Sequence, residues 1–491
     1  MKKSSNGTLS EIIVAFVLVC VVSVVFSITL SSCGSVPAAQ PSADKAEVVA
    51  KEEPKPQKKP AKKEYTKVDF IEDLQRTLEA DGPDAALEFF DKKIPAKSAD
   101  DFDLLFLKAA INVSGNHLDE AQEMCDMLSA RDPDNQDVIS LATAIAKMRG
   151  DTAEKNKRIK ELLAKDKYNP TANVELGTEQ LLKKNYKQAK DYYTKALARE
   201  PKNEDALLGK GQCEYYLERD DEAKELLQKL VDVNPYNVDA YLYLGKIAYA
   251  NDEYKIASDH AKKALDIDPE RYECNMDYGM YERYLGHFDN ALKSWTKAIE
   301  IEPDYFLAYA YRAGLYDEEN QYDKALKDYL MVVKLNPQYY YAYESIGVLA
   351  LLQKDFKMAR ESFMKCFERN KTNISYPLMI TYCYYMEKND KAAKDFSNQV
   401  LRKMDRNSVD YTMLRVFHDK AGEKPLKQRI GNMNNRNQQG KMYYYLGLFY
   451  DMFGADEGAK EFYAKVVAMN CPMFFEYRLA EVRVKETGGS L

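Results

Sequence analysis

The sequence predicts an all-α fold, a right-handed solenoid of stacked helix hairpins. Its strongest support is a repeat of 34 residues, because five prolines follow one another at this interval: Pro201, Pro235, Pro269, Pro303 and Pro337. Small residues keep the same interval, as at Gly211, Gly245 and Gly279. Only 21 glycines and 17 prolines occur in 491 residues, well below the roughly 12% that these residue types make up on average. Long helices are therefore favoured over a sandwich or barrel, which needs frequent turn residues.

The overall composition excludes several classes of protein. Lys and Arg number 71 against 78 Asp and Glu, a net charge of −7, and this mild acidity argues against a dedicated nucleic-acid binder. Hydrophobic residues at 45% and charged residues at 30% exclude wholesale disorder and a multi-span membrane protein. With four histidines in the chain, sites built from several His ligands or bases are disfavoured.

Residues 1–33 are predicted to be a targeting segment. Lys2 and Lys3 precede an uncharged apolar run over residues 12–30, and Leu-Ser-Ser-Cys follows, ending at Cys33. This order describes a secretory signal. Its end resembles a bacterial lipobox, and the resemblance implies that Cys33 is lipidated. The length of the run also suits an uncleaved signal anchor. Both alternatives place the rest of the chain outside the cytoplasm.

Residues 34–64 are predicted to be a disordered linker. The segment holds five prolines, seven lysines and five acidic residues. Such a composition cannot bury a core, so we expect an extended, solvated tether on the order of 90 Å long. The alternative, a lysine patch that binds anionic lipid, is disfavoured by the interleaved acids.

The remainder divides according to the repeat. We count unit positions from residue 102 and start a new unit every 34 residues. The predicted parts are an N-terminal helical cap (65–101), the repeat array (102–407), an irregular connector (408–439), a last repeat (440–473), and a capping helix with the tail (474–491). The capping helix is expected to shield the last apolar face of the stack.

The spacing of residue types within a unit has a physical cause. Each unit is predicted to be two helices of roughly 13 residues. The small residue at position 8 of the first helix is expected to touch the alanine at position 20 of the second, because closely crossing helices exclude larger side chains. The aromatic residue at position 24, such as Trp295, is expected to fill the gap toward the next unit. Proline at position 32 ends the second helix.

This pattern resembles the tetratricopeptide repeat (TPR). Five residues stand at positions typical of that family: Leu244, Gly245, Ala291, Trp295 and Pro303. The resemblance implies a protein-binding scaffold. The Lys-Asn-Arg clamp of chaperone-binding TPR domains is absent at the corresponding positions of this chain.

A concave groove lined by the first helices is the candidate binding site. Tyrosine combines large contact area with a polar tip, which suits peptide recognition. The alternative is that these tyrosines only pack between neighbouring helices. The candidate residues are Tyr215, Asp239, Lys246, Tyr249, Glu273, Arg283, Tyr341, Glu344, Tyr382 and Tyr385.

Nothing in the sequence predicts an enzyme, a metal site or a cofactor. The motifs HExxH, GxSxG, GxGxxG and the Walker loop do not occur, and neither does CxxC. Because His117 and His287 both occupy position 16 of a repeat, we expect them to have a structural role and not to act as catalytic bases. The six cysteines after Cys33 are expected to be small interior hydrophobes, with a Cys366–Cys383 bridge as an alternative.

The C-terminal region resembles NlpI-type TPR lipoproteins of the bacterial outer membrane. The resemblance covers about 40 residues and rests on Asn470, Phe474, Glu476, Arg478 and Ala480, which follow a Leu-Gly pair and alanines of the generic repeat. It implies a non-enzymatic, membrane-tethered adaptor in the bacterial cell envelope that docks proteins, such as envelope proteases or peptidoglycan hydrolases. A structural homodimer, a pilus or outer-membrane assembly factor, and a peptidoglycan-acting enzyme are the alternatives.

Overall fold

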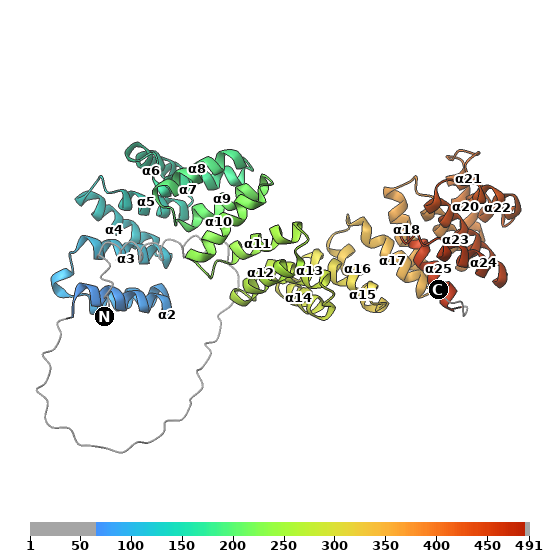
Figure 1. Ribbon diagram of the computed structural model, residues 1–491, viewed down its shortest axis with the longest axis horizontal. Coiled ribbons are helices and arrows are strands. Elements are labelled where there is room, and N and C mark those ends of the chain that lie inside the picture. The colour runs from blue at the N-terminus through green and yellow to red at the C-terminus, as the bar shows by residue number, and fades with distance from the viewer. Residues whose placement is uncertain (1–64, 487–491) are drawn as a thin grey trace, which may run out of the picture. The chain divides into compact units, whose positions relative to one another are not determined.

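The computed structural model describes residues 65–486 and confirms the predicted fold class. These residues form 24 α-helices and one short 3-10 helix and contain no strand. Consecutive helices pack side by side as hairpins (Figure 1). The helices belong to two compact units, unit 1 ending at Asn234 and unit 2 beginning at Pro235, and each is described by itself. The predicted signal or anchor with Cys33, the predicted linker 34–64 and residues 487–491 lie outside the described residues.

Unit 1 contains the first nine α-helices: α2 (Lys67–Lys93), α3 (Phe102–Ser114), α4 (Leu118–Arg131), α5 (Gln136–Met148), α6 (Thr152–Lys165), α7 (Pro170–Leu182), α8 (Tyr186–Arg199), α9 (Glu204–Tyr216) and α10 (Asp220–Val233), with the 3-10 helix η1 (Ala96–Ser98). Helix α2 is kinked at Gly82, where the backbone is left-handed, and Pro83 follows the kink. The two arms pack on each other through Phe70 and Phe90, whose ring centroids lie 5.3 Å apart.

Unit 2 contains the other fifteen: α11 (Val238–Ala250), α12 (Tyr254–Ile267), α13 (Tyr272–Tyr284), α14 (Phe288–Ile301), α15 (Phe306–Glu318), α16 (Tyr322–Leu335), α17 (Tyr340–Leu352), α18 (Phe356–Arg369), α19 (Ser375–Met386), α20 (Asp390–Leu401), α21 (Val409–Asp419), α22 (Glu423–Gly431), α23 (Arg436–Met452), α24 (Asp456–Ala468) and α25 (Phe475–Glu486). From α11 to α18, odd-numbered helices are the first of each repeat and even-numbered helices the second.

The ends of the helices follow the 34-residue repeat. Each second helix from α8 to α16 stops two residues before its proline, as α14 does at Ile301 before Pro303. From α3 to α22, the turn inside each hairpin contains a residue with positive φ that recurs every 34 positions: Asn116, Gly150, Lys184, Glu218, Asp252, Gly286, Asn320, Lys354, Lys388 and Gly422. Asparagine caps several first helices, for example Asn237, whose Oδ1 accepts from the N–H of Ala240 at 2.9 Å.

The packing inside a repeat differs from the prediction in one respect. The aromatic residue at position 24 lies against the position-8 glycine of its own unit. A Cβ built on Gly279 would lie 2.6 Å from Nε1 of Trp295, and one on Gly347 would lie 2.8 Å from Phe363. Where position 24 is the small Ala261, a Cβ built on Gly245 would lie 3.4 Å from the carbonyl oxygen of Ala257, the predicted neighbour, and equally far from the ring of Tyr281. The glycine therefore serves mainly to seat a ring.

The same ring also reaches the next repeat, as the sequence suggested. Trp295 is fully buried, donates from Nε1 to the carbonyl oxygen of Met276 at 3.3 Å, and stacks on Tyr311 of the following unit at 5.6 Å. Tyr193 lies between Gly177 of its own hairpin and Gly209 of the next. One aromatic side chain thus joins two hairpins.

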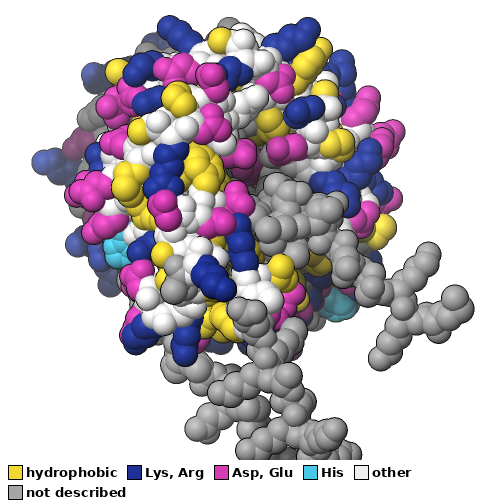
Figure 2. All heavy atoms as spheres, turned by 90° about the vertical axis from the view of Figure 1, so that its left-hand side faces the viewer, with side chains coloured by type: hydrophobic (Ala, Val, Ile, Leu, Met, Phe, Trp, Pro, Cys, Tyr) yellow, Lys and Arg dark blue, Asp and Glu magenta, His cyan; other side chains and the backbone are white. Residues whose placement is uncertain are grey.

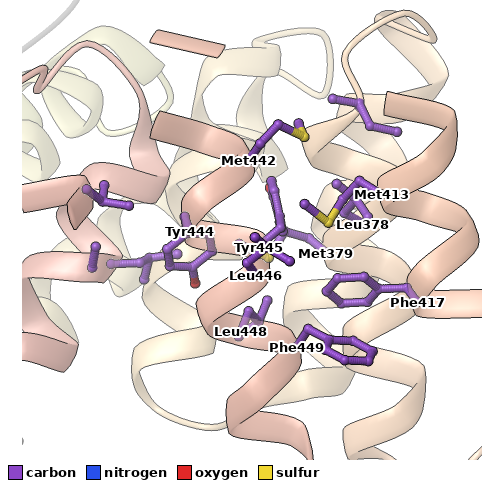
Figure 3. Close-up of a cluster of buried hydrophobic side chains, with 14 of the residues drawn as sticks. Leu378, Met379, Met413, Phe417, Met442, Tyr444, Tyr445, Leu446, Leu448 and Phe449 are labelled. Carbon is purple, nitrogen blue, oxygen red and sulfur yellow. The ribbon is translucent and has the colours of Figure 1, made fainter. Parts of the chain in front are cut away.

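The segment predicted as an irregular connector, 408–439, is helical. It forms α21 and α22, and α23 begins at Arg436 rather than at residue 440. Met413 and Phe417 of α21 are buried in the largest hydrophobic cluster, beside Leu378 and Met379 of α19 and residues of α23 (Figure 3). The helices α21 and α22 span 11 and 9 residues, shorter than those of the other hairpins. Gly422 in their turn still keeps the 34-residue interval, and the period is lost in the next hairpin, where Gly454 follows Gly422 by 32 positions.

A buried carboxyl group in this cluster predicts a pH-dependent stability. Glu476 of α25 is fully buried; its Oε1 accepts from the hydroxyl of Tyr445 at 2.8 Å, and its Oε2 has no hydrogen-bond partner. Burial raises the pKa of Glu476 above its usual value of 4.5. A folded-state pKa above the unfolded one stabilises the fold below the unfolded pKa, and this contribution is lost as pH rises through the folded pKa.

We therefore expect Glu476→Gln to raise the melting temperature at pH 8 and to change it little at pH 4. Glutamine keeps the acceptor for Tyr445 and carries no charge, so the gap between the variant and the wild-type protein should widen with pH. Thermal melts at several pH values measure this. Glu486→Gln, on an exposed side chain of the same helix, is the control, and a pH-independent gap for Glu476→Gln would contradict the assignment.

Candidate binding face

The first helices α11 and α13 bring several of the predicted residues onto one face of unit 2. Asp239, Lys246 and Tyr249 come from α11, and Glu273 and Arg283 come from α13. Within a helix they recur at intervals of three to ten residues that keep them on one side. We call the surface formed by these five residues, together with Asp277, the first-helix face. All six side chains are at least partly exposed.

Ion pairs between successive repeats order this face. Arg271 donates from Nη2 to Oδ1 of Asp239 at 2.7 Å. Nζ of Lys246 lies 3.8 Å from Oδ2 of Asp277, and Arg283 pairs with Glu318 of α15. The sequence prediction missed Arg271, Asp277 and Glu318. The sequence does contain a signal for these ion pairs, because the residues of opposite charge lie about one repeat apart. Stacking of the repeats brings them together.

Asp277 is the most unusual group of this face. Its Oδ2 is buried and makes no hydrogen bond, and Lys246 approaches only to 3.8 Å. Burial raises the pKa of Asp277 to about 6, while the positive charge of Lys246 opposes the rise. A buried acceptor without a donor is costly. The free energy of the face would therefore fall if a ligand supplied an N–H group or a cation at this oxygen.

Tyr249 lies in a cluster of four tyrosine rings. Its ring centroid is 5.3 Å from that of Tyr281 and 5.2 Å from that of Tyr284, and Tyr254 stacks on Tyr284 at 4.8 Å. Burial and the neighbouring hydroxyls raise the pKa of Tyr249 to about 12. Tyr284 remains half exposed, so the cluster presents a rigid aromatic surface next to the charged residues. Only Tyr249 was predicted here.

The other predicted residues lie elsewhere. Tyr215 belongs to α9 of unit 1, where its ring meets that of Tyr216 at 5.3 Å. Tyr341 is 82% exposed. Glu344 accepts from the hydroxyl of Tyr376 at 2.6 Å, and the Tyr382 ring packs edge-on against Phe356.

Tyr385 is a correction, because it is buried rather than exposed. Its hydroxyl donates to the carbonyl oxygen of Phe417 at 2.9 Å. Helix α21, which the sequence prediction treated as irregular, packs against α19 and covers this residue. Tyr385 therefore holds α19 to α21 and offers no contact area to a ligand.

The C-terminal helix covers part of the corresponding face farther along unit 2. Arg478 of α25 forms a two-pronged ion pair with Asp317 of α15, with N–O distances of 2.7 and 2.5 Å. Its guanidinium also lies over the ring of Tyr322, 5.2 Å from the centroid, and Phe475 stacks on Phe363 at 5.6 Å. The predicted capping helix thus contacts α15, α16, α17 and α18, and none of these contacts involves α11 or α13.

Among residues 65–486, no group of three or more His, Cys, Asp or Glu side chains is arranged to hold a metal ion. Cys366 and Cys383 are separate, buried thiols. On the face shown in Figure 2, positive and negative side chains alternate without a large patch of one sign. No described helix has the length and apolar character that crossing a bilayer requires.

Comparison with known families explains the period. Three tetratricopeptide repeat models match residues 180–244, 277–340 and 340–373. These segments are tetratricopeptide repeats. Repeats of this type commonly mediate contacts between proteins, and scaffolds built from them are typically non-catalytic. No curated protein sequence matches the chain significantly.

Solved structures share the fold over part of the chain. MamA is 24% identical, covering 33% of this chain and 95% of MamA, with a TM-score of 0.31. PilF of Pseudomonas aeruginosa is 20% identical, covering 43% of this chain and 96% of PilF, with a TM-score of 0.39. YrrB, described as a TPR protein with an unusual peptide-binding site, is 20% identical over 40% of this chain and 97% of its own, with a TM-score of 0.33.

Proposed function

We propose that this protein is a non-enzymatic adaptor that binds a segment of another protein on the first-helix face of α11 and α13. The observation that carries the proposal is the buried Oδ2 of Asp277, which accepts no hydrogen bond and has only Nζ of Lys246 near it, at 3.8 Å. The tyrosine cluster around Tyr249 belongs to the same two helices. Such a surface offers an acceptor for a backbone N–H or a cationic side chain and aromatic area for apolar contact.

Photo-crosslinking tests this proposal in the full-length protein in cells. A photoreactive residue at position 273, exposed on α13, is expected to capture a discrete protein partner. The same residue at position 262, exposed on the second helix α12, is the matched control. Asp277→Asn keeps the shape and removes the charge, so it should lower the yield at position 273 several-fold.

Two results would contradict the proposed binding face. Equal capture of the same partner from positions 273 and 262 would place the contact elsewhere. An unchanged yield in the Asp277→Asn variant would show that the carboxylate takes no part. Circular dichroism of the purified variants checks that the helices are intact.

We further propose that the adaptor is tethered to a bacterial envelope membrane through a lipid on Cys33, with residues 34–64 as spacer. The basic start, the apolar run and the Ser-Ser-Cys end support this, as does the resemblance of residues 443–480 to NlpI-type lipoproteins. Envelope proteases or peptidoglycan hydrolases are the partners that this resemblance favours. The described helices carry no part of this second proposal.

Cys33→Ser is expected to release the protein from the membrane fraction, because the lipid attachment is lost and a cleaved signal leaves no other anchor. Fractionation followed by immunoblotting measures this, and Cys471→Ser serves as the control cysteine. Retention of the Cys33→Ser protein on the membrane would instead support the uncleaved signal anchor.

A further inference from the structure

The connections between successive hairpins lie along one edge of unit 2. Each connection leads from the end of a second helix to the start of the next first helix, and the helices pack in antiparallel order, so the connections share that edge. We call the last four connections the C-terminal edge: residues 370–374, 402–408, 432–435 and 469–474. Hydrogen bonds join neighbouring connections, because Arg429 donates to the carbonyl oxygen of Asn407 and Arg436 donates to that of Met469.

Positive charge gathers on the C-terminal edge. Its connections contain one acidic residue, Asp405, and four cations: Lys371, Arg402, Lys403 and Arg406. All four cations are exposed, and none forms an ion pair within residues 65–486. Earlier on the same edge the sign is reversed, because connection 302–305 carries Glu302 and Asp304 without a cation. Charge is therefore separated along the edge, in a chain whose net charge is −7.

An apolar side chain projects from the same edge. Met473 is 83% exposed and follows Pro472, which is also exposed. Its other neighbour, Phe474, is buried against Gly440 of α23, where an added Cβ would lie 2.8 Å from the ring. Phe474 therefore fixes this connection in place while the side chain of Met473 stays in water. An apolar side chain held in that way gains free energy when a ligand covers it.

Unpaired cations beside a fixed apolar side chain suit an anionic lipid surface. Each lysine or arginine close to such a surface strengthens binding roughly fivefold. The guanidinium groups of Arg402 and Arg406 match pairs of phosphate oxygens in the headgroups. An apolar side chain is accommodated at the boundary between headgroups and acyl chains. The cations alone would also suit an acidic protein segment, but such a segment offers carboxylates and little apolar area to Met473.

We propose that the C-terminal edge is a docking surface for an anionic lipid bilayer. Its four cations lie at the headgroup phosphates, and Met473 enters the boundary between headgroups and acyl chains. The same bilayer repels the negative connection 302–305, so contact is confined to the C-terminal edge. This contact uses other residues than the first-helix face does, and it holds whether or not Cys33 is lipidated.

Fluorescence quenching in the full-length protein tests this contact. Met473→Trp places an indole on the edge, and the natural tryptophan, Trp295, is fully buried. The vesicles contain phosphatidylcholine and phosphatidylglycerol in equal parts, with a nitroxide-labelled lipid as quencher. We expect quenching of the indole at position 473 on these vesicles and none on phosphatidylcholine alone. Because the readout is local, attachment through the predicted apolar run 12–30 does not produce it.

Charge variants in the Met473→Trp background test the cations. Arg402→Gln with Arg406→Gln should raise the lipid concentration for half-maximal quenching by about tenfold or more. Lys388→Gln with Lys391→Gln is the matched control and should leave it unchanged. Both of these lysines are exposed and lack an ion pair among the described residues, but they lie at the turn inside the hairpin of α19 and α20, on the opposite edge. Salt at about 1 M, where the Debye length is about 3 Å, should abolish the quenching.

The opposite results would overturn the proposal. No quenching on the anionic vesicles would show that the edge does not reach lipid, and equal quenching on phosphatidylcholine alone would exclude the charges. Equal weakening by the two charge pairs would show that the position of the cations is unimportant. Soluble poly-glutamate is a second probe. If it changed the emission from position 473 while the anionic vesicles did not, the edge would bind an acidic protein segment instead. Circular dichroism checks that the variants keep their helices.

Discussion

Trp295→Ala is expected to lower the stability of unit 2 by about 3–5 kcal/mol. The indole is fully buried, fills the space above Gly279, and stacks on Tyr311 of the next hairpin. Its removal leaves a cavity that touches two repeats, and it also removes the donor to the carbonyl of Met276. Because one side chain joins two hairpins, the loss spreads beyond its own unit.

Denaturant unfolding followed by circular dichroism measures this change, with Tyr341→Ala as the control. Tyr341 is 82% exposed, so its removal should change the free energy of unfolding by no more than about 0.5 kcal/mol. A loss of under about 1 kcal/mol for Trp295→Ala would show that the ring does not hold the stack together.

Arg478→Ala is expected to have the second-largest effect, a loss of about 1–3 kcal/mol. The guanidinium forms two hydrogen bonds to Asp317 and lies over the ring of Tyr322. The Asp317 side chain is only 13% exposed, so its charge is left poorly solvated when the arginine is removed. Helix α25 then loses its main polar contact with α15.

Hydrogen exchange shows where this loss acts. The amides of α25 should exchange faster in Arg478→Ala, while those of α11 and α12 keep their rates. Lys485→Ala, on an exposed position of the same helix, is the control and should leave both regions unchanged. Unaltered exchange of α25 in the arginine variant would refute the role of this ion pair.

The fold was predictable from sequence because its determinants repeat. Two local requirements of one hairpin are a proline two residues after the second helix, as from α8 to α16, and a small residue at position 8. Stacking repeats these requirements along the chain and so makes the period visible. The period does not say which ring lies on which glycine, and so the prediction found the contact of Trp295 with the next repeat but missed its contact with Gly279. Distances in space, unlike spacings along the chain, depend on how the helices cross.

The candidate site was predictable only in part. Position within a helix placed Lys246, Tyr249 and Glu273 on the groove, and their side chains are at least partly exposed. It failed for Tyr385, because α21 buries this side chain. The sequence prediction had treated the segment that forms α21 as irregular. The coverage of α15 by α25 was also unpredictable, because Arg478 and Asp317 are separated by 161 residues.

The ring of position 24 lies on the glycine of position 8, and the same glycine substitution made in two backgrounds tests this contact directly. In the wild-type chain, Gly279→Ala places a Cβ 2.6 Å from Trp295 and should cost about 1–3 kcal/mol. In a Trp295→Leu background the clash is relieved. The same substitution should then become neutral or stabilise by up to about 1 kcal/mol, because alanine is the better helix former.

Gly314→Ala is the matched control, since a Cβ at this helical position would find its nearest neighbour at 3.9 Å; it should be neutral or stabilising in both backgrounds. The measurement is the free energy of unfolding of the four Gly279 and Trp295 combinations. The account predicts that the effect of Gly279→Ala changes from a loss to none, or to a gain, when the indole is absent. An equal effect in both backgrounds would contradict it.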